Sequence, residues 1–291
     1  MGNYIICAKE IHSGTSIDDI ENPLEVTEIA TELVITRLYC LMMLNDGTIS
    51  KTDTIVTTSE RKCLYENIFD NVIDWNTYTS LKASWRWKHM GNEVIDLLSP
   101  STFKSLSSGQ VKDRLIPYLP FYQNWDRDKN NIQDIHFSSL KEYDVSNKFI
   151  CLLIRTRSAW PEKNLSKEYW KKLIKILEDQ NIKVFVFGKE TEEYATKKTE
   201  YVKNFRDWCS IVNHSNCKQI ISTITGGVYP AFICGTDKIN LVIIDNLDLV
   251  KKYGYDPSWY NDCINFTNVN KNIINYLPST NELVEMVKNG I

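Results

Sequence analysis

Short apolar runs alternate along this 291-residue chain with segments whose apolar residues recur at helical spacing. Strands that alternate with helices pair in parallel through crossover connections, so the pattern predicts an α/β fold built on parallel sheets. The runs typical of buried strands are YIICA (4–8), DTIVTT (53–58), NVIDW (71–75), EVIDLLS (93–99), KFICLLIR (148–155), KVFVFG (183–188), CKQIISTI (217–224) and INLVIID (239–245). The predicted helices cover residues 25–44, 59–69, 166–180 and 279–290.

The alternation stops between residues 117 and 147, where prolines, aromatic residues and polar clusters follow one another without a period. This composition is typical of a connector between domains. The sequence therefore predicts two Rossmann-like domains, 1–145 and 146–291. An alternative for the final helix is that it packs back on the first domain.

Net charge and composition limit the classes of partner and the location that we expect for this chain. The formal net charge is −3, which disfavours nucleic acid as a partner because nonspecific binding of nucleic acid needs a broad basic surface. A local anion pocket stays compatible with this charge. The sequence contains no run of about 18 apolar residues, so no membrane span is expected. Eight scattered cysteines without a CxxC motif are typical of reduced thiols, and we expect a cytoplasmic location.

Three predicted strands of the second half end in loops with residues suited to a nucleotide. Ligands of open parallel sheets bind outside the carboxyl ends of the strands. The first loop, RTRSAWPEKN, carries Arg155, Arg157 and Lys163, and such cations suit phosphate oxygens. Each loop by itself also fits an ordinary surface loop, but three such loops together predict a site for a diphosphate with an attached ribose.

The other two loops contribute glycines and a carboxylate. In GKETEE, Gly188 lets a ligand approach the backbone and a nearby glutamate can accept ribose hydroxyls. In TITGGVYP, Gly226 and Gly227 open a predicted helix whose free N–H groups favour a phosphate. The alternatives are a tight turn for the glycine pair and an exposed first helical turn for the acidic run.

The stretch RTRSAWPEKNLSKEYWKKLIKILEDQNIKVFVFGKETEE resembles the donor-binding half of the GT-B glycosyltransferases, in particular the heptosyltransferase family (glycosyltransferase family 9). The resemblance covers residues 148–245 and extends to the first half only by element order. It implies two domains that face each other across a cleft, an N-terminal one for the acceptor and a C-terminal one for the nucleotide-sugar. The residues that it assigns to the donor are Thr156, Arg157 and Lys163 at the phosphates, Glu192 at the ribose, and Thr225 and Gly226 at a helix start.

The chain departs from the pattern of the family at two positions. Ile224 stands where the family has an aspartate, and Tyr229 stands where it has a histidine. These departures leave open a divergent branch with a different sugar.

The resemblance also implies a catalytic base in the loop after the first strand, where the family has a Gly-Asp pair. Asp18 and Asp19 occupy these two positions here, so Asp19 is the predicted base. A carboxylate suits this role because the acceptor hydroxyl must lose its proton as it attacks the anomeric carbon. The alternatives are Glu10 or His12 as the base, and a helix cap as the role of the aspartates.

The sequence and its resemblance thus predict a glycosyltransferase of glycan biosynthesis, of the hexosyl or heptosyl type, without a cofactor. The resemblance implies that the enzyme is metal-independent and inverts the anomeric configuration. Its partners would be a nucleotide-sugar donor and a glycan or other acceptor hydroxyl. The alternatives are a sugar-nucleotide epimerase of the same fold and a noncatalytic binding module. The Asp126–Asp128 pair and the four histidines receive no role, and the tryptophans of SWRWKHMGNE (84–93) fit either packing or sugar binding.

Overall fold

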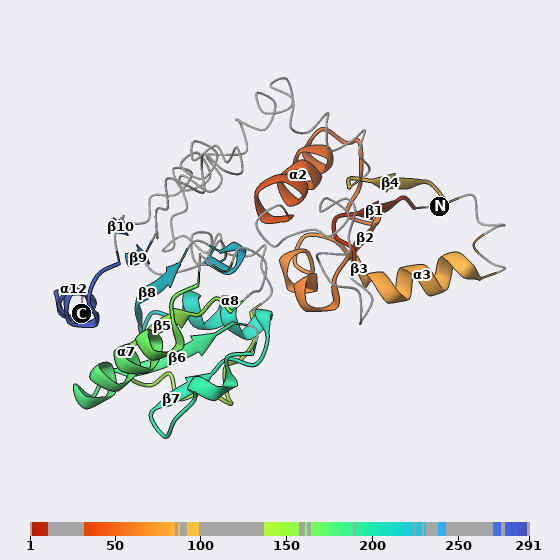
Figure 1. Ribbon diagram of the computed structural model, residues 1–291. Coiled ribbons are helices and arrows are strands. Elements are labelled where there is room, and N and C mark those ends of the chain that lie inside the picture. Colours follow the sequence, from red (N-terminus) through yellow and green to blue (C-terminus); the bar gives the residue numbers. More distant parts are fainter. Residues whose placement is uncertain are drawn as a thin grey trace. The chain divides into compact units, whose positions relative to one another are not determined.

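The computed structural model divides the chain into two compact units, Met1–Phe137 and Ser138–Ile291 (Figure 1). The unit boundary lies a few residues before the predicted one. The residues that the structure describes are 2–10, 32–84, 87, 92–98, 137–156, 161, 164–188, 190–223, 225–228, 230, 238–242, 270–274 and 277–289. Within these residues, no helix combines the length and the apolar character that crossing a membrane requires.

The first unit contains a parallel sheet of four short strands with the spatial order β3-β2-β1-β4. The strands are β1 (Tyr4–Ile6), β2 (Thr54–Thr57), β3 (Asn71–Asp74) and β4 (Val94–Asp96). All four were predicted, and β1 is central because its residues are almost entirely apolar. The strands β1, β2 and β3 follow one another towards one side of the sheet, whereas β4 lies on the other side of β1. The switch point, where open sheets bind ligands, therefore lies at the carboxyl ends of β1 and β4.

Helical segments join these strands. They are the π-helix η3 (Glu32–Thr36), α2 (Arg37–Asn45), the 3-10 helix η4 (Ser59–Leu64) and α3 (Trp75–Ala83). The sequence did not predict α3, because its apolar residues have little helical period. A cap defines its start instead, since the side chain of Asp74 accepts a hydrogen bond from the backbone N–H of Thr77.

A buried carboxylate ties η3 to the sheet and to η4. Glu32 is fully buried, and its carboxylate forms an ion pair of 2.8 Å with Arg61. The hydroxyls of Thr57 and Tyr65 donate hydrogen bonds to the same carboxylate. A charge buried with this many partners is tolerated, whereas an unpaired one is strongly destabilising. The network therefore fixes the segment that enters α2 against the carboxyl end of β2.

The second unit contains a parallel sheet of six strands with the order β10-β9-β8-β5-β6-β7. The strands are β5 (Phe149–Leu153), β6 (Lys183–Phe187), β7 (Thr199–Tyr201), β8 (Cys217–Thr223), β9 (Lys238–Val242) and β10 (Asn270–Ile274). Counted along the chain, the spatial order is 3-2-1-4-5-6, that of a dinucleotide-binding Rossmann domain. Its switch point lies between β5 and β8. The short edge strand β7 and the strand β10 were not predicted.

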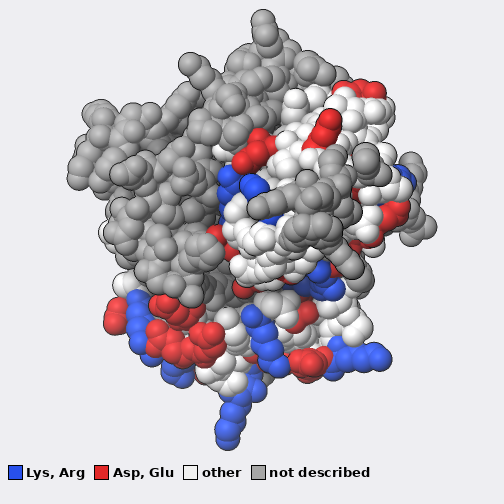
Figure 2. Space-filling view, turned by 90° about the vertical axis from the view of Figure 1, so that its right-hand side faces the viewer, with Lys and Arg blue, Asp and Glu red and all other residues white. Residues whose placement is uncertain are grey.

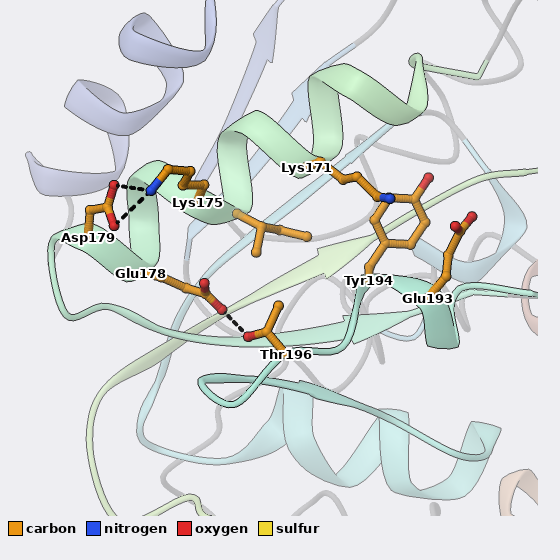
Figure 3. Close-up of a pocket in the computed structure, with 8 residues that line it drawn as sticks. Lys171, Lys175, Glu178, Asp179, Glu193, Tyr194 and Thr196 are labelled. Atoms are coloured by element: carbon orange, nitrogen blue, oxygen red, sulfur yellow. Dashed lines mark hydrogen bonds and ion pairs between the residues drawn. The ribbon is translucent and has the colours of Figure 1, made fainter.

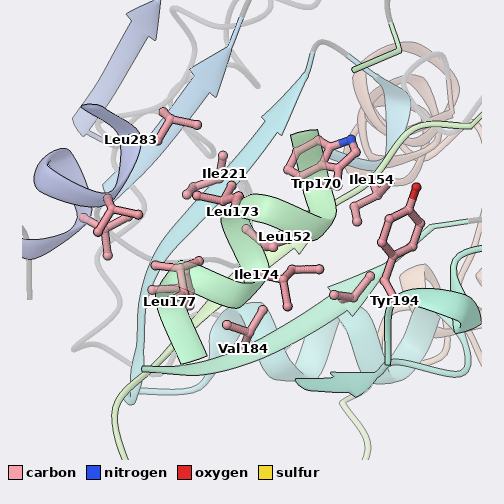
Figure 4. Packing of buried hydrophobic residues seen from close by; sticks show 14 of the residues in the cluster. Leu152, Ile154, Trp170, Leu173, Ile174, Leu177, Val184, Tyr194, Ile221 and Leu283 are labelled. Carbon is pink, nitrogen blue, oxygen red and sulfur yellow. The ribbon is translucent and has the colours of Figure 1, made fainter. Parts of the chain in front are cut away.

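Helices cover both faces of this sheet. They are α7 (Lys167–Asp179), α8 (Phe205–Asn213) and α12 (Thr280–Lys288), with the 3-10 segments η9 (Glu192–Tyr194) and η10 (Gly226–Val228). The predicted apolar face of α7 is confirmed, since Trp170, Leu173, Ile174 and Leu177 are buried. They pack on alternate residues of β5 and β6, as Figure 4 shows.

The last helix, α12, starts with a capping box between Ser279 and Glu282. Its buried residues Leu283, Val284 and Val287 join the core around α7 of the same unit. These described contacts differ from the alternative that the sequence left open, in which this helix packs on the first domain. A second contact joins α7 to the segment before α12, because the Tyr169 hydroxyl donates a hydrogen bond of 2.8 Å to the carbonyl of Pro278.

Stability should fall at alkaline pH because two tyrosines donate hydrogen bonds from partly buried hydroxyls. Burial raises the pKa of Tyr169, and likewise that of Tyr143, from about 10 to about 12. A raised pKa gives stability that is complete below pH 10 and is lost as the pH rises towards 12. We expect Tyr169→Phe to cost about 1 kcal/mol at pH 7, and to lose less stability than the wild type between pH 10 and 12. Urea unfolding at pH 7, 10 and 11 tests this, and equal losses in both proteins would contradict it.

Candidate functional site

Three predicted donor loops follow neighbouring strands in the second unit. The loops after β8, β5 and β6 leave the carboxyl edge of the sheet next to one another, because these strands are adjacent in that order. The switch point lies between the first two. The structure thus brings the described residues of the three predicted loops to one edge, whereas the sequence had only placed each after a strand.

Arg155, directly after β5, has a largely structural environment. The side chain is 8% exposed, and its guanidinium donates a hydrogen bond to the side-chain oxygen of Asn164. This bond closes the loop that contains Arg157 and Lys163, which both lie outside the described residues. The next residue, Thr156, is exposed. Arg155 therefore helps to hold the shape of the loop, and the predicted contacts of this loop with phosphate stay predictions.

Gly188 directly follows β6, close to the backbone of Ile154, which directly follows β5. Its φ of +150° disfavours a side chain, and a Cβ atom there would lie 2.1 Å from the carbonyl oxygen of Ile154. The Gly188 carbonyl accepts a hydrogen bond of 2.8 Å from the Thr191 hydroxyl, which fixes the turn into η9. Glu192, the predicted ribose partner, is exposed at the start of η9.

The loop after β8 is held against the neighbouring strands. The Gly227 carbonyl accepts a hydrogen bond of 3.1 Å from the indole N–H of Trp208, and a Cβ atom at Gly227 would lie 3.2 Å from the side chain of Leu153. Thr225 accepts a hydrogen bond from the backbone N–H of Val228, so η10 begins there. Gly226 is partly exposed. The glycines thus let a helical turn start close to the end of β5.

The hydroxyl of Thr223, the last residue of β8, is buried and has no hydrogen-bond partner among the described residues. An unmet buried hydroxyl costs about 1–3 kcal/mol. Its place at the switch point marks this edge as one where a ligand or an ordered water could supply the missing bond.

The carboxyl edge of the first unit carries an ion pair that the sequence analysis missed. The Nζ atom of Lys9, which follows β1, lies 3.0 Å from a carboxylate oxygen of Asp96, which ends β4. The same Nζ atom lies 5.7 Å from the ring centre of Trp75, at the start of α3. In the second half, the candidate residues were sought in the loops after predicted strands. The same search in the first half would have found Lys9 and Asp96.

Glu10 belongs to the same edge and connects three elements. One carboxylate oxygen accepts a hydrogen bond of 2.7 Å from the backbone N–H of Ser59, and the other accepts one of 2.6 Å from the side chain of Asn76. The loop after β1 is thereby tied to the starts of η4 and α3. This role of Glu10 is structural, and the assignment of the base stays a prediction. Asp18, Asp19 and His12 lie outside the described residues, as do Ile224 and Tyr229.

A surface pocket of about 430 Å³ lies along α7, between this helix and the segment that contains η9 (Figure 3). Several of its polar groups are engaged with each other or with close neighbours. Lys175 pairs with Asp179 at 3.1 Å, and Glu178 accepts hydrogen bonds from Thr196 and Thr199. These contacts stabilise the crossover between β6 and β7, and none of the predicted site residues lines the pocket.

The charged groups of the described surface show no metal site. Among the described residues, no three His, Cys, Asp or Glu side chains are grouped so that they could hold a metal ion. On the face drawn in Figure 2, lysines and arginines are interspersed with aspartates and glutamates over the described part. The described cysteines, namely Cys7, Cys40, Cys63, Cys151, Cys209 and Cys217, are buried and form no disulfide with one another.

Comparison with solved structures identifies proteins with a similar fold. The chain matches E. coli ADP-heptose LPS heptosyltransferase II over 99% of its own length and 98% of that chain, with a TM-score of 0.56 and 11% identity. It has the GT-B fold. The predicted α/β fold class is thereby confirmed, and the resemblance to the heptosyltransferases is confirmed at the level of the fold.

Two further solved structures are similar to this chain. E. coli heptosyltransferase WaaC with ADP-2-deoxy-2-fluoro heptose matches over 100% of both chains, with a TM-score of 0.53 and 11% identity. The glycosyl transferase family 9 protein of Veillonella parvula matches over 99% of this chain and 90% of that chain, with a TM-score of 0.50 and 14% identity. No family model matches the sequence. No curated protein matches it either.

Proposed function

We propose that this GT-B chain is a glycosyltransferase that moves a sugar from a nucleotide-sugar donor to an acceptor hydroxyl. One observation supports it most: the loops after β8, β5 and β6 meet at the switch point of a sheet with Rossmann strand order. A structurally similar protein, WaaC, was solved with an ADP-sugar analogue. The second unit is the proposed donor-binding unit, and the first is the proposed acceptor-binding unit.

The donor loops have complementary roles in this proposal. Thr156, Arg157 and Lys163 bind the diphosphate, in a loop whose shape Arg155 holds through Asn164. The backbone N–H groups at the helical turn that Thr225, Gly226 and Gly227 begin face the same negative charge. Glu192 accepts hydrogen bonds from the ribose, and Gly188 keeps the backbone close to the ligand.

The reaction needs a base and a stabilised leaving group. Asp19 takes the proton of the acceptor hydroxyl while its oxygen attacks the anomeric carbon, and the bond to the diphosphate breaks. The nucleoside diphosphate leaves with the electron pair, and the cations and N–H groups of the donor loops stabilise its charge without a metal. Attack opposite to the leaving group inverts the anomeric configuration. Asp18 lies next to the base in the same loop.

A thermal-shift panel with UDP, GDP, ADP, CMP and TDP tests the donor site. We expect one nucleotide to raise the melting temperature clearly above the others, because a ligand at a hundredfold excess over its Kd adds about 2.7 kcal/mol to the stability. We expect Arg157→Ala to lose most of this shift, since it removes a cation from the phosphates.

The matched control is Lys175→Ala, which removes a cation from the exposed surface of α7. It should keep the full nucleotide shift, so that loss in Arg157→Ala is specific to the loop. If no nucleotide shifts the melting temperature of the wild type, the donor site and the proposed function are both wrong.

A further inference from the structure

We propose that the acceptor is a neutral carbohydrate, bound at the carboxyl edge of the first sheet by Trp75 and the Lys9–Asp96 pair. This inference rests on the proposed function and adds to it the chemical class of the acceptor. The donor loops all belong to the second unit, so the two proposals depend on different residues.

Trp75 provides the flat surface on which a sugar ring can lie. It is the first residue of α3, directly after the carboxyl end of β3, and its side chain is only partly buried. The ring of Tyr78 supports it from within the unit at a centroid distance of 5.4 Å. An indole held in this way stays partly exposed beside the Lys9 ammonium at the carboxyl edge, and aromatic side chains commonly line small-molecule sites.

Trp87, which the sequence left open between packing and sugar binding, packs on the same cluster as Trp75. Its ring contacts Tyr4 at 4.6 Å and Tyr78 at 5.6 Å, and like Trp75 it is partly buried. Trp75 differs in that its ring also lies beside the charged Lys9 Nζ atom of the edge.

The Lys9–Asp96 pair matches two neighbouring hydroxyls of a sugar. The ammonium group only donates hydrogen bonds and the carboxylate only accepts them, whereas a sugar hydroxyl does both. With the two groups 3.0 Å apart, one hydroxyl can accept from Lys9 while its neighbour donates to Asp96. The side chains are 23% and 31% exposed, so they are fixed by the pair and still reachable.

Tyr78, whose ring contacts Trp75, carries an unsatisfied buried hydroxyl. Tyr78 is 1% exposed, and its hydroxyl has no hydrogen-bond partner among the described residues. Burial raises its pKa, and the charge of Asp96 adds to the rise. A sugar hydroxyl, directly or through a water, would supply the missing partner.

The charges at this edge favour a neutral ligand over an anionic one. Lys9 is neutralised by Asp96, and Glu10 adds a second carboxylate whose described partners are both uncharged. Asp74 immediately precedes Trp75, and Lys62 interacts with it electrostatically. Among these described groups, three carboxylates stand against two ammonium groups, so a phosphorylated or sulfated acceptor would meet an excess of negative charge, which costs binding free energy.

An array of neutral oligosaccharides and their sialylated, sulfated and phosphorylated counterparts tests the proposal with the full chain. We expect retention on at least one neutral glycan, and calorimetry with that glycan should show at least about tenfold weaker binding for Trp75→Ala. Trp75→Phe keeps an aromatic face and should stay within about threefold of the wild type. Asp96→Asn should weaken the binding several-fold, because Lys9 then lacks its charged partner.

The control on the same helix is Leu81→Ala, an exposed position that should bind as the wild type does. Binding to anionic glycans alone, to no glycan, or equally well by Trp75→Ala would overturn the inference. The melting temperature of each variant without ligand reports whether it is folded, and the nucleotide shift separates the two proposals. If that shift persists without neutral-glycan binding, only the acceptor class is wrong. If glycan binding persists without any nucleotide shift, the transferase is wrong, and the edge binds a glycan that is not an acceptor.

Discussion

Gly188→Ala is expected to destabilise the second unit by about 3 kcal/mol or more. Alanine is disfavoured at φ +150°, and its Cβ would lie 2.1 Å from the carbonyl oxygen of Ile154. That carbonyl cannot easily move, because the N–H of Ile154 donates a 2.9 Å hydrogen bond to Phe187 at the end of the neighbouring strand. Urea unfolding measures the loss. Since Arg155 follows Ile154, the nucleotide shift should also fall.

Gly47→Ala is the matched control, because Gly47 also has a positive φ (+78°) but no atom lies within 4 Å of the added Cβ. It should cost only about 1 kcal/mol, the usual penalty of that backbone conformation. If both variants lose the same small amount of stability, the close approach between β5 and the turn after β6 is wrong.

Asp19→Asn is expected to lower turnover by about 10²–10⁴-fold, the usual contribution of a general base. The measurement is the release of nucleoside diphosphate from the sugar nucleotide whose diphosphate gives the largest thermal shift, with a glycan retained on the array as the acceptor. The nucleotide shift should be unchanged, because the donor loops belong to the other unit. If Asp19→Asn loses turnover but keeps the nucleotide shift, the protein is a transferase and not a noncatalytic binding module.

Glu10→Gln gives the comparison within the same loop. The amide keeps one acceptor oxygen but loses the other, so one of the hydrogen bonds from Ser59 and Asn76 weakens at a cost of about 1 kcal/mol. Turnover should fall by less than about tenfold. Asp179→Asn, on the surface of α7, should leave turnover unchanged. Full activity of Asp19→Asn together with a large loss in Glu10→Gln would transfer the role of base to Glu10.

The local pattern of the sequence was sufficient for most elements of the fold. The strand residues of β5 and β6 are almost all apolar, as in parallel strands covered on both faces. The cap at Ser166 and the spacing of Trp170, Leu173 and Leu177 predicted α7 nearly to its ends. Where these signals are weak, as in α3 and the three-residue β7, the sequence predicted nothing, because packing against the sheet stabilises these elements more than their own propensity does.

The sequence by itself determined that this chain is an α/β protein with nucleotide-suited residues after three strands, because those features depend on periodicity and on residue type. Only the tertiary structure decided that β8 lies beside β5, which brings those loops to one switch point. It also decided that Arg155 bonds to Asn164 and that Lys9 meets Asp96, residues 87 positions apart. Strand order and such contacts depend on which distant segments pack together, and no local pattern specifies that.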